Sequence, residues 1–139
     1  PGNLGTILRT LAWFGNYRCL LSPDSVEPFN GKAVRASMGA VLHVPVETEV
    51  TLESLPARYS HIAALDMQGE SIAAPAFHEH QCYVFGSEAR GLPRQVLQSI
   101  GARPFTIPGT GAIESLNLAA AVAICQHELH RPAPRPAGL

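Results

Sequence analysis

Charged residues, cysteines and long apolar runs are all scarce in this 139-residue chain, and each scarcity excludes a class of protein. Charged residues make up 15% of the chain and hydrophobic residues 46%, which is the balance of a globular domain and not of a disordered chain. The longest apolar stretch, from Leu116 to Cys125, is about half of what a membrane-spanning helix needs, so we expect no membrane span.

The charge balance also bears on possible partners. The formal net charge of −1 gives the chain no bulk attraction for nucleic acid. Binding of RNA would therefore need a local basic patch, a separate domain or a groove between two copies.

Few residues have the identity and spacing that metal binding or disulfide formation requires. The three cysteines, Cys19, Cys82 and Cys125, lie far apart without metal-binding spacing, so we expect them to be reduced and mostly buried. The six histidines show no i, i+4 pair and no carboxylate-linked pattern, so no metal site is predicted. The segment Pro1-Gly2-Asn3 lacks the basic and apolar parts of a secretory signal, which favours a cytoplasmic location.

Apolar spacing predicts helices that alternate with short strands. The first helix covers Leu4 to Phe14, with Asn3 as its N-cap and Gly15 as its stop. Further helices are expected over 32–37, 52–57, 92–100 and 115–129, and strands over 17–21, 41–46, 62–65, 81–85 and 103–107. Because the strands are apolar without alternation, they are typical of a parallel sheet covered by helices on both faces, and the fold class is α/β.

This organisation predicts one domain over residues 1–130, followed by a proline-rich flexible tail over 131–139. A parallel α/β sheet normally feeds its helices from strands, whereas this chain opens directly on a helix. We therefore expect a first strand upstream of Pro1.

Three glycine-containing segments, 1–9, 85–91 and 107–117, each adjoin a predicted helix, and the last two follow apolar segments. Ligands of open parallel sheets bind beyond the carboxyl ends of the strands, where such loops gather, and glycines let the backbone approach a ligand closely. Neither the dinucleotide fingerprint nor the P-loop pattern occurs. A nucleotide-binding oxidoreductase is therefore a weak alternative.

The three segments together resemble the motifs of a known family. Asn3-x-Gly5-x-x-x-Arg9, Gly86-x-Glu88-x-x-Gly91 and Ile107-Pro108 through Ser115-Leu116-Asn117 are similar to the three motifs of the TrmH-type branch of the SPOUT methyltransferases, in the same order. The segment 35–46 is also similar, so the resemblance spans Pro1 to about Leu129.

This resemblance implies a parallel sheet with a C-terminal deep trefoil knot. It implies S-adenosyl-L-methionine as cofactor and methyl transfer to a ribose 2′-hydroxyl of rRNA or tRNA, with rRNA favoured. It further implies a homodimer whose interface uses the first and last helices.

The resemblance also assigns roles to individual residues. Arg9 would stabilise the developing alkoxide or hold the substrate phosphate, because a guanidinium is a poor base. Its catalytic partners would be Asn3, Glu88, Ser115 and Asn117. The cofactor would lie against Leu65, Asp66, Gly86, Ile107 and Leu116. Candidate RNA-phosphate contacts are Arg18, Arg35, Arg90 and Arg94.

Structural roles remain open for several of these residues. Asn3 and Ser115 could be helix caps only, and Glu88 could be only an ion-pair partner. Trp13 and Phe14 fit the core or a subunit interface better than a base-stacking platform.

Two functional alternatives also remain open, a non-catalytic RNA-binding module of the same fold and a SPOUT enzyme that methylates a base nitrogen. The presence of Arg9, Glu88 and Asn117 favours an enzyme over the module. Asn3 with Arg9, together with the triplet Ser115-Leu116-Asn117, favours the ribose over a base.

Overall fold

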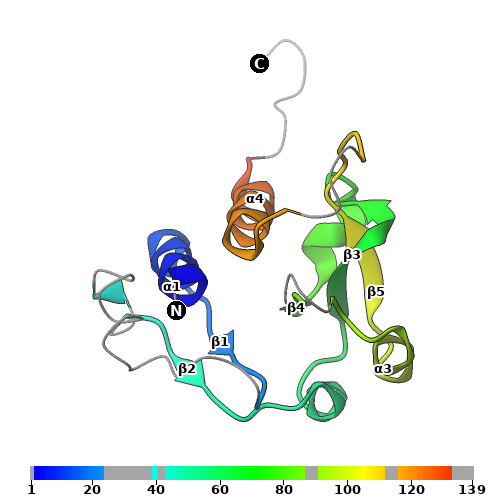
Figure 1. Cartoon of the computed structure of the whole chain (residues 1–139), viewed down its shortest axis with the longest axis horizontal. Helices are drawn as coiled ribbons and strands as arrows, with labels where there is room; N and C mark the ends of the chain where they lie inside the picture. Colours follow the sequence, from blue (N-terminus) through cyan, green and yellow to red (C-terminus); the bar gives the residue numbers. More distant parts are fainter. Residues whose placement is uncertain (1, 24–38, 41–42, 87–90, 112–115, 133–139) are drawn as a thin grey trace.

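The computed structural model describes residues 2–23, 39–40, 43–86, 91–111 and 116–132 (Figure 1). The helices are α1 (Gly2–Phe14), α3 (Arg94–Ser99) and α4 (Leu118–His130), with 3₁₀ helices at Leu52–Ala57 and Pro75–Glu79. The strands are β1 (Cys19–Leu20), β2 (Val46–Glu47), β3 (Ile62–Ser71), β4 (Cys82–Val84) and β5 (Arg103–Thr106).

All described strand pairs are parallel, as the apolar strands predict. β1 pairs with β2, and a second sheet has the strand order β4-β3-β5. The α/β class with parallel sheets is therefore confirmed. The strands form two sheets instead of one, because no strand of the described residues pairs with both β1 and β4.

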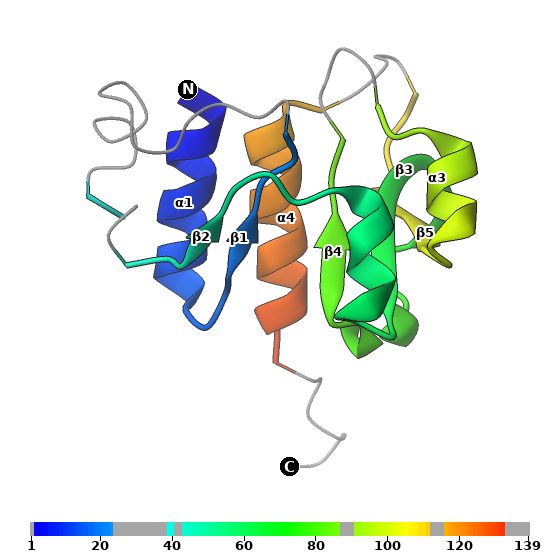
Figure 2. The ribbon, with the colours of Figure 1, turned by 90° about the horizontal axis from the view of Figure 1, so that it is seen from below.

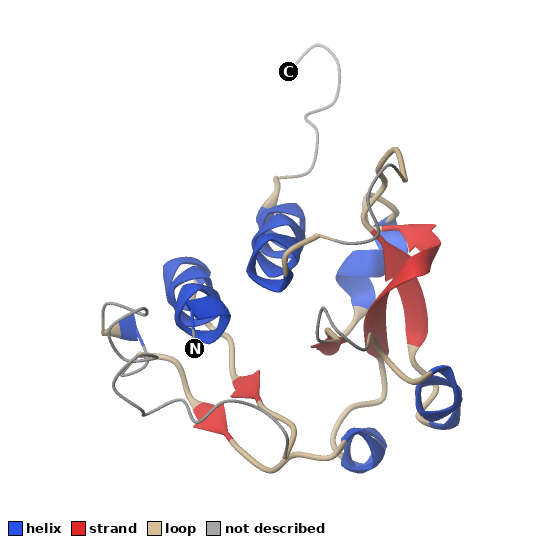
Figure 3. Ribbon diagram, in the orientation of Figure 1, coloured by secondary structure: helices blue, strands red, loops and turns tan. Residues whose placement is uncertain are grey.

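Successive residues of β3 face opposite sides of the second sheet, so each side has its own core. Ile62 and Ala64 pack with residues of α3 and the 52–57 helix, whereas Ala63 packs against Phe105 and against Cys125 of α4. Figure 3 shows helices on both sides of these strands. Covering both faces explains why the strands are apolar throughout.

The third core joins α1 to the first sheet. Leu4, Leu8 and Leu11 lie on one face of α1 and pack against Cys19 of β1. Gly15 ends the helix with a φ of +78°, and its N–H donates to the Leu11 carbonyl at 2.8 Å.

The C-terminal ends of α1 and α4 are held together by their side chains. The ring of Phe14 stacks on His130 at 4.8 Å, and the Tyr17 hydroxyl lies 2.7 Å from Nε2 of His130. Both views place the two helices side by side (Figures 1 and 2). This pair of helices forms one outer surface of the molecule.

Several predicted boundaries are wrong. α1 begins at Gly2, so Asn3 lies inside its first turn and is not its N-cap. The N-cap of α4 is Asn117. Pro93 caps α3 instead of lying inside it. The strand expected over 41–46 is limited to Val46–Glu47 among the described residues, and the 75–79 helix was not predicted. The helix expected over 32–37 lies outside the described residues.

β3 is much longer than the four residues predicted for it, since it continues to Ser71. The register with β5 shifts between Leu65 and Glu70, so the segment 66–69 forms an irregularity within the strand. Its composition, Asp-Met-Gln-Gly, is that of a turn, which explains the early end in the prediction.

Burial controls the chemistry of the cysteines, none of which forms a disulfide. Burial raises the pKa of Cys19 to about 11 and that of Cys125 to about 12. Both thiols therefore stay protonated at neutral pH and behave as small apolar core residues. Within the described residues, no helix has both the length and the apolar character to cross a membrane.

Candidate active site

The motif segments come to one edge of the molecule because of the parallel topology. β3, β4 and β5 run in the same direction, so the loops after β4 and β5 leave the sheet at the same edge. Figure 2 shows the N-terminal ends of α1 and α4 at this edge. Asn3, Gly86 and Asn117 are thereby brought to the same end of the fold.

The predicted cofactor residues supply apolar side chains and closely packed glycine backbone at this edge. Leu65 and Ile107 are partly buried against the Phe105 core, whereas Leu116 keeps 43% of its surface exposed. A Cβ at Gly86 would lie 2.7 Å from the carbonyl carbon of Gly91, so only glycine lets these two backbone segments approach. These residues fit a nucleoside, which needs apolar contact for its base and main-chain groups for its polar edge.

Asp66 is a charged residue among the described residues at this edge. Its side chain is 25% exposed, and its Oδ1 accepts a hydrogen bond from the Met67 N–H at 2.6 Å. Its Oδ2 lies 4.0 Å from Nη2 of Arg94, which also donates weakly to Gln68 at 3.5 Å. The carboxylate is thus fixed by its own backbone and only loosely paired.

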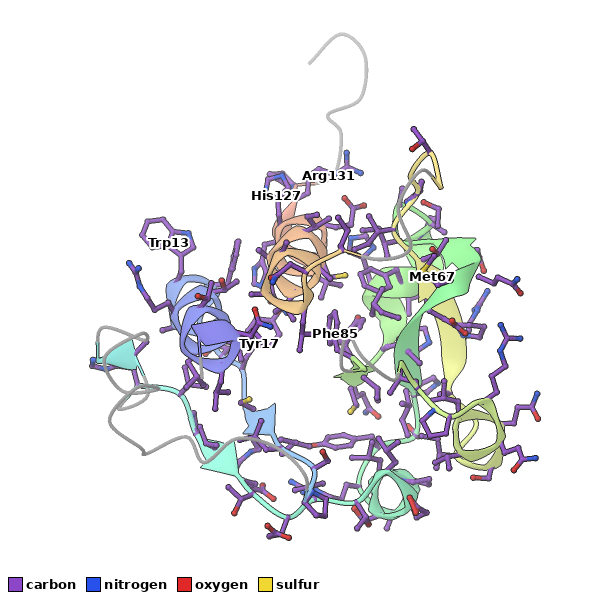
Figure 4. All side chains as sticks on the ribbon, in the orientation of Figure 1. Trp13, Tyr17, Met67, Phe85, His127 and Arg131 are labelled. Carbon is purple, nitrogen blue, oxygen red and sulfur yellow. The ribbon has the colours of Figure 1, made fainter. Side chains whose placement is uncertain are left out.

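Arg9 lies elsewhere within the single chain. It is exposed on α1 and lines a cavity of about 390 Å³ between α1 and α4. The cavity is lined by Thr6, Arg9, Thr10, Trp13, Phe14 and Ala123, and none of these belongs to the loops after β4 or β5. Figure 4 shows Trp13 pointing away from Phe85, which begins the Gly86 loop. Among the described residues, the lining of this cavity therefore includes none of the other predicted site residues.

Trp13 is the most exposed large apolar side chain of the described residues, at 84%. Of the two places expected for Trp13, this exposure excludes the core of the single chain, and a subunit interface stays a prediction. Its position next to Arg9 follows from helical spacing, because residues i and i+4 share a face. The residues Thr6, Thr10 and Ala123 of the same cavity were missed, since no motif marks them.

Asn117 has a definite structural role. Its Oδ1 accepts a hydrogen bond from the Ala120 N–H at 3.2 Å, which caps α4. The side chain is exposed, and its amide nitrogen carries two N–H donors that the cap does not use. Glu88 and Ser115 lie outside the described residues.

The candidate RNA-contacting arginines differ in whether they already form ion pairs within the chain. Arg18 donates to Glu47 at 3.1 Å, and Arg58 donates to both oxygens of the same carboxylate at 2.9 and 2.8 Å. The hydrogen bond from Arg58, supported by Arg18, lowers the pKa of Glu47. Arg58 was missed, because nothing in the spacing links it to Glu47. Arg35 and Arg90 lie outside the described residues.

Among the described residues, no group of three or more histidine, cysteine, aspartate or glutamate side chains could hold a metal ion.

The family model described as the SpoU rRNA methylase family matches residues 1–127. The chain belongs to this family. The match includes every predicted site residue of the three motifs. It also covers all of α1 and most of α4, the two helices that line the Arg9 cavity.

Two curated relatives match most of this chain. A Synechocystis protein named as an uncharacterized tRNA/rRNA methyltransferase is 34% identical over 94% of this chain and 49% of its own. The 23S rRNA (guanosine-2′-O-)-methyltransferase of Bordetella pertussis is 30% identical over 92% of this chain and 54% of its own. The chain spans about half the length of these two relatives.

A solved structure of a named rRNA methyltransferase has a similar fold. The AdoMet-bound rRNA methyltransferase of Sinorhizobium meliloti superposes with a TM-score of 0.83 at 32% identity, over 94% of this chain and 52% of that one. The arrangement of parallel sheets and flanking helices is therefore that of a family member.

Proposed function

We propose that the protein transfers a methyl group from S-adenosyl-L-methionine to a ribose 2′-hydroxyl of rRNA or tRNA, with rRNA favoured. The observation that carries the proposal is the gathering of the motif-bearing ends of α1, β4 and α4 at one edge, in a chain of the SpoU family. Relatives that are named as 2′-O-methyltransferases of rRNA support the choice of ribose.

The cofactor would be held at the motif edge, which is the edge where the loops after β4 and β5 lie near the N-terminal ends of α1 and α4. Leu65, Ile107 and Leu116 would contact the adenine, and the backbone at Gly86 would bind its polar groups, with Asp66 at the border. When bound there, the cofactor supplies an electrophilic methyl group. The chain itself must hold the acceptor oxygen about 3 Å from that methyl carbon, which supplies the entropic part of catalysis.

The acceptor proton would pass to solvent water, and stabilising the oxygen that loses it is the second task of the chain. A ribose hydroxyl is a very weak acid, so negative charge that develops on its oxygen must be stabilised. Arg9 would do this directly or through the substrate phosphate, because its guanidinium is permanently charged. Asn3, Glu88, Ser115 and Asn117 would orient Arg9 and the ribose by hydrogen bonds.

A homodimer would complete this site. Arg9 shares its cavity with the exposed Trp13, and Ile124 of α4 is also 40% exposed. A second copy packed on α1 and α4 would cover these apolar side chains and could bring Arg9 to the motif edge of its partner. The position of Arg9 outside its own motif edge supports this arrangement.

RNA would be held by local contacts, because the net charge is −1. Arg18, Arg35, Arg90 and Arg94 remain the candidates for phosphate contacts. The cytoplasm remains the expected compartment. The deep trefoil knot in the C-terminal part is proposed from the family alone.

The two separate sheets support the further strand that we expect upstream of Pro1. In the described residues, β1 pairs only with β2 and β4 pairs only with β3. Leu20 of β1 nevertheless packs against the core cluster that contains Val84 of β4. A parallel strand between these two open edges would join both sheets into one.

Transfer of labelled methyl from the cofactor to total RNA, followed by nuclease mapping, tests the proposed function. The wild type should label a ribose, and Arg9→Ala should lower the rate by at least about tenfold. No transfer to any RNA by an intact, cofactor-binding protein would favour the non-catalytic module. Label on a base would favour the base-methylating alternative.

A further inference from the structure

The least tightly paired carboxylate among the described ion pairs is also one of the less exposed. The Asp66–Arg94 separation is 4.0 Å, whereas the other four pairs have N···O distances of 2.6 to 3.1 Å. Asp66 is nevertheless only 25% exposed. Among the described residues, no cation lies closer to Asp66 than Arg94, and a partly desolvated carboxylate with so distant a partner is costly, so its position calls for a reason other than stability.

The hydrogen bonds of Asp66 leave part of the carboxylate available. Oδ1 accepts from the Met67 N–H, whereas no hydrogen bond to Oδ2 is present among the described residues. A carboxylate can accept about four hydrogen bonds, so Asp66 retains acceptor capacity. It stands directly after Leu65, which packs in the same core cluster as Ile107.

We propose that Asp66 makes the protein prefer the positively charged cofactor over its neutral demethylated product, and that Arg94 limits this preference. The inference rests on the proposed function. S-adenosylmethionine carries a sulfonium charge that S-adenosylhomocysteine lacks. A negative carboxylate at the border of the site attracts the sulfonium form selectively, and the guanidinium at 4.0 Å offsets part of that attraction.

This proposal gives Arg94 a role in addition to the predicted phosphate contact. Its guanidinium faces Asp66 and Gln68 of β3 from the start of α3. With 65% of its side chain exposed and a long ion pair, Arg94 contributes little to folding. Replacement of Arg94 should therefore change the electrostatics of the site without unfolding the protein.

The chain offers a matched control on the same strand. Glu70 also lies on β3 and pairs with Arg103 at 2.6 Å, and both side chains are about half exposed, at 46% and 51%. This pair repeats the chemistry of Asp66 and Arg94 with a closer ion pair and a more exposed carboxylate.

The test is calorimetric binding of S-adenosylmethionine and S-adenosylhomocysteine to the intact protein without RNA, read as the ratio of the two dissociation constants. Asp66→Asn should lower the preference for the charged form by about three- to tenfold. This is the size expected when one unit charge near the sulfonium is removed. Arg94→Gln should raise the preference. Both changes should shrink in about 1 M salt, where the screening length is only about 3 Å.

Glu70→Gln and Arg103→Gln should leave the ratio unchanged. Equal changes in both affinities for Asp66→Asn, or an unchanged ratio for both site variants, would overturn the inference while leaving the proposed function intact. Failure of the wild type to bind either ligand would instead overturn the proposed function together with the inference. Weaker RNA binding of Arg94→Gln with an unchanged ratio would return Arg94 to the role of a phosphate contact.

Discussion

At the scale of single residues, Gly69 shows how one backbone position permits the irregular strand β3. Its φ is +145°, and a Cβ placed there would lie 2.6 Å from the carbonyl oxygen of Pro104. Side chains do not tolerate such an approach, and the φ itself disfavours every residue except glycine. The segment that carries Asp66 can therefore lie against β5 only because residue 69 has no side chain.

We predict that Gly69→Ala lowers the free energy of unfolding by about 2–4 kcal/mol, because it adds both strain and a backbone clash. Gly15→Ala is the matched control, since Gly15 also has a positive φ, of +78°, but has no atom within 4 Å of the added Cβ. Gly15→Ala should lower the free energy of unfolding by only about 1 kcal/mol. Urea unfolding followed by circular dichroism, at equal protein concentrations, measures both. A Gly69 variant as stable as the Gly15 variant would contradict the assigned clash.

At the scale of elements, α4 depends on Asn117 in two separable ways. The Oδ1 atom caps the helix, whereas the amide nitrogen is the group available for the proposed catalytic role. Asn117→Ala should lower the free energy of unfolding by about 1 kcal/mol through loss of the cap. Asn117→Asp keeps the accepting oxygen, so it should retain stability and still lose methyl transfer by at least about tenfold.

Thermal unfolding together with the methyl-transfer rate distinguishes the two roles of Asn117. A fully active Asn117→Asp protein would reduce this residue to a helix cap. Low activity together with wild-type stability would support the catalytic role.

The elements also show why sequence patterns succeed in some places and fail in others. The spacing of Leu4, Leu8 and Leu11 predicts α1 well, because one apolar face decides where the helix lies. The extension of β3 depends on pairing with β5, about 35 residues away, which overrides the turn composition of 66–69. Tertiary contacts of this kind leave no local signal in the sequence.

The candidate site follows the same division. The motifs predict that Gly86, Ile107 and Asn117 adjoin one ligand, and parallel topology explains why they do lie at one edge. The location of Arg9 on the α1–α4 surface could not be predicted, because helical spacing gives its face but not what that face meets. The loose pairing of Asp66 likewise depends on where α3 places Arg94.

At the scale of the whole molecule, the α1–α4 surface is where the proposed homodimer would form. Trp13 is 84% exposed, so its removal costs the core nothing, whereas in an interface a tryptophan is a typical anchor. Trp13→Ala should weaken the dimer by about 10- to 100-fold without loss of folding. Met67→Ala is the control, because Met67 is also exposed, at 63%, but lies on β3. Sedimentation at micromolar concentration measures both, and a monomeric wild type would contradict the dimer.

The same dimer predicts which copy supplies Arg9. If Arg9 acts on the partner's motif edge, a mixed dimer of Arg9→Ala and Asn117→Asp chains contains one site with both defects and one intact site. Equal mixing with free exchange should then give about a quarter of the wild-type rate or more, whereas each variant alone keeps about a tenth of that rate or less. If Arg9 acts within its own chain, every site of the mixed dimer carries one defect and no activity returns. Restored methyl transfer would therefore require that each active site is built from two copies of the chain.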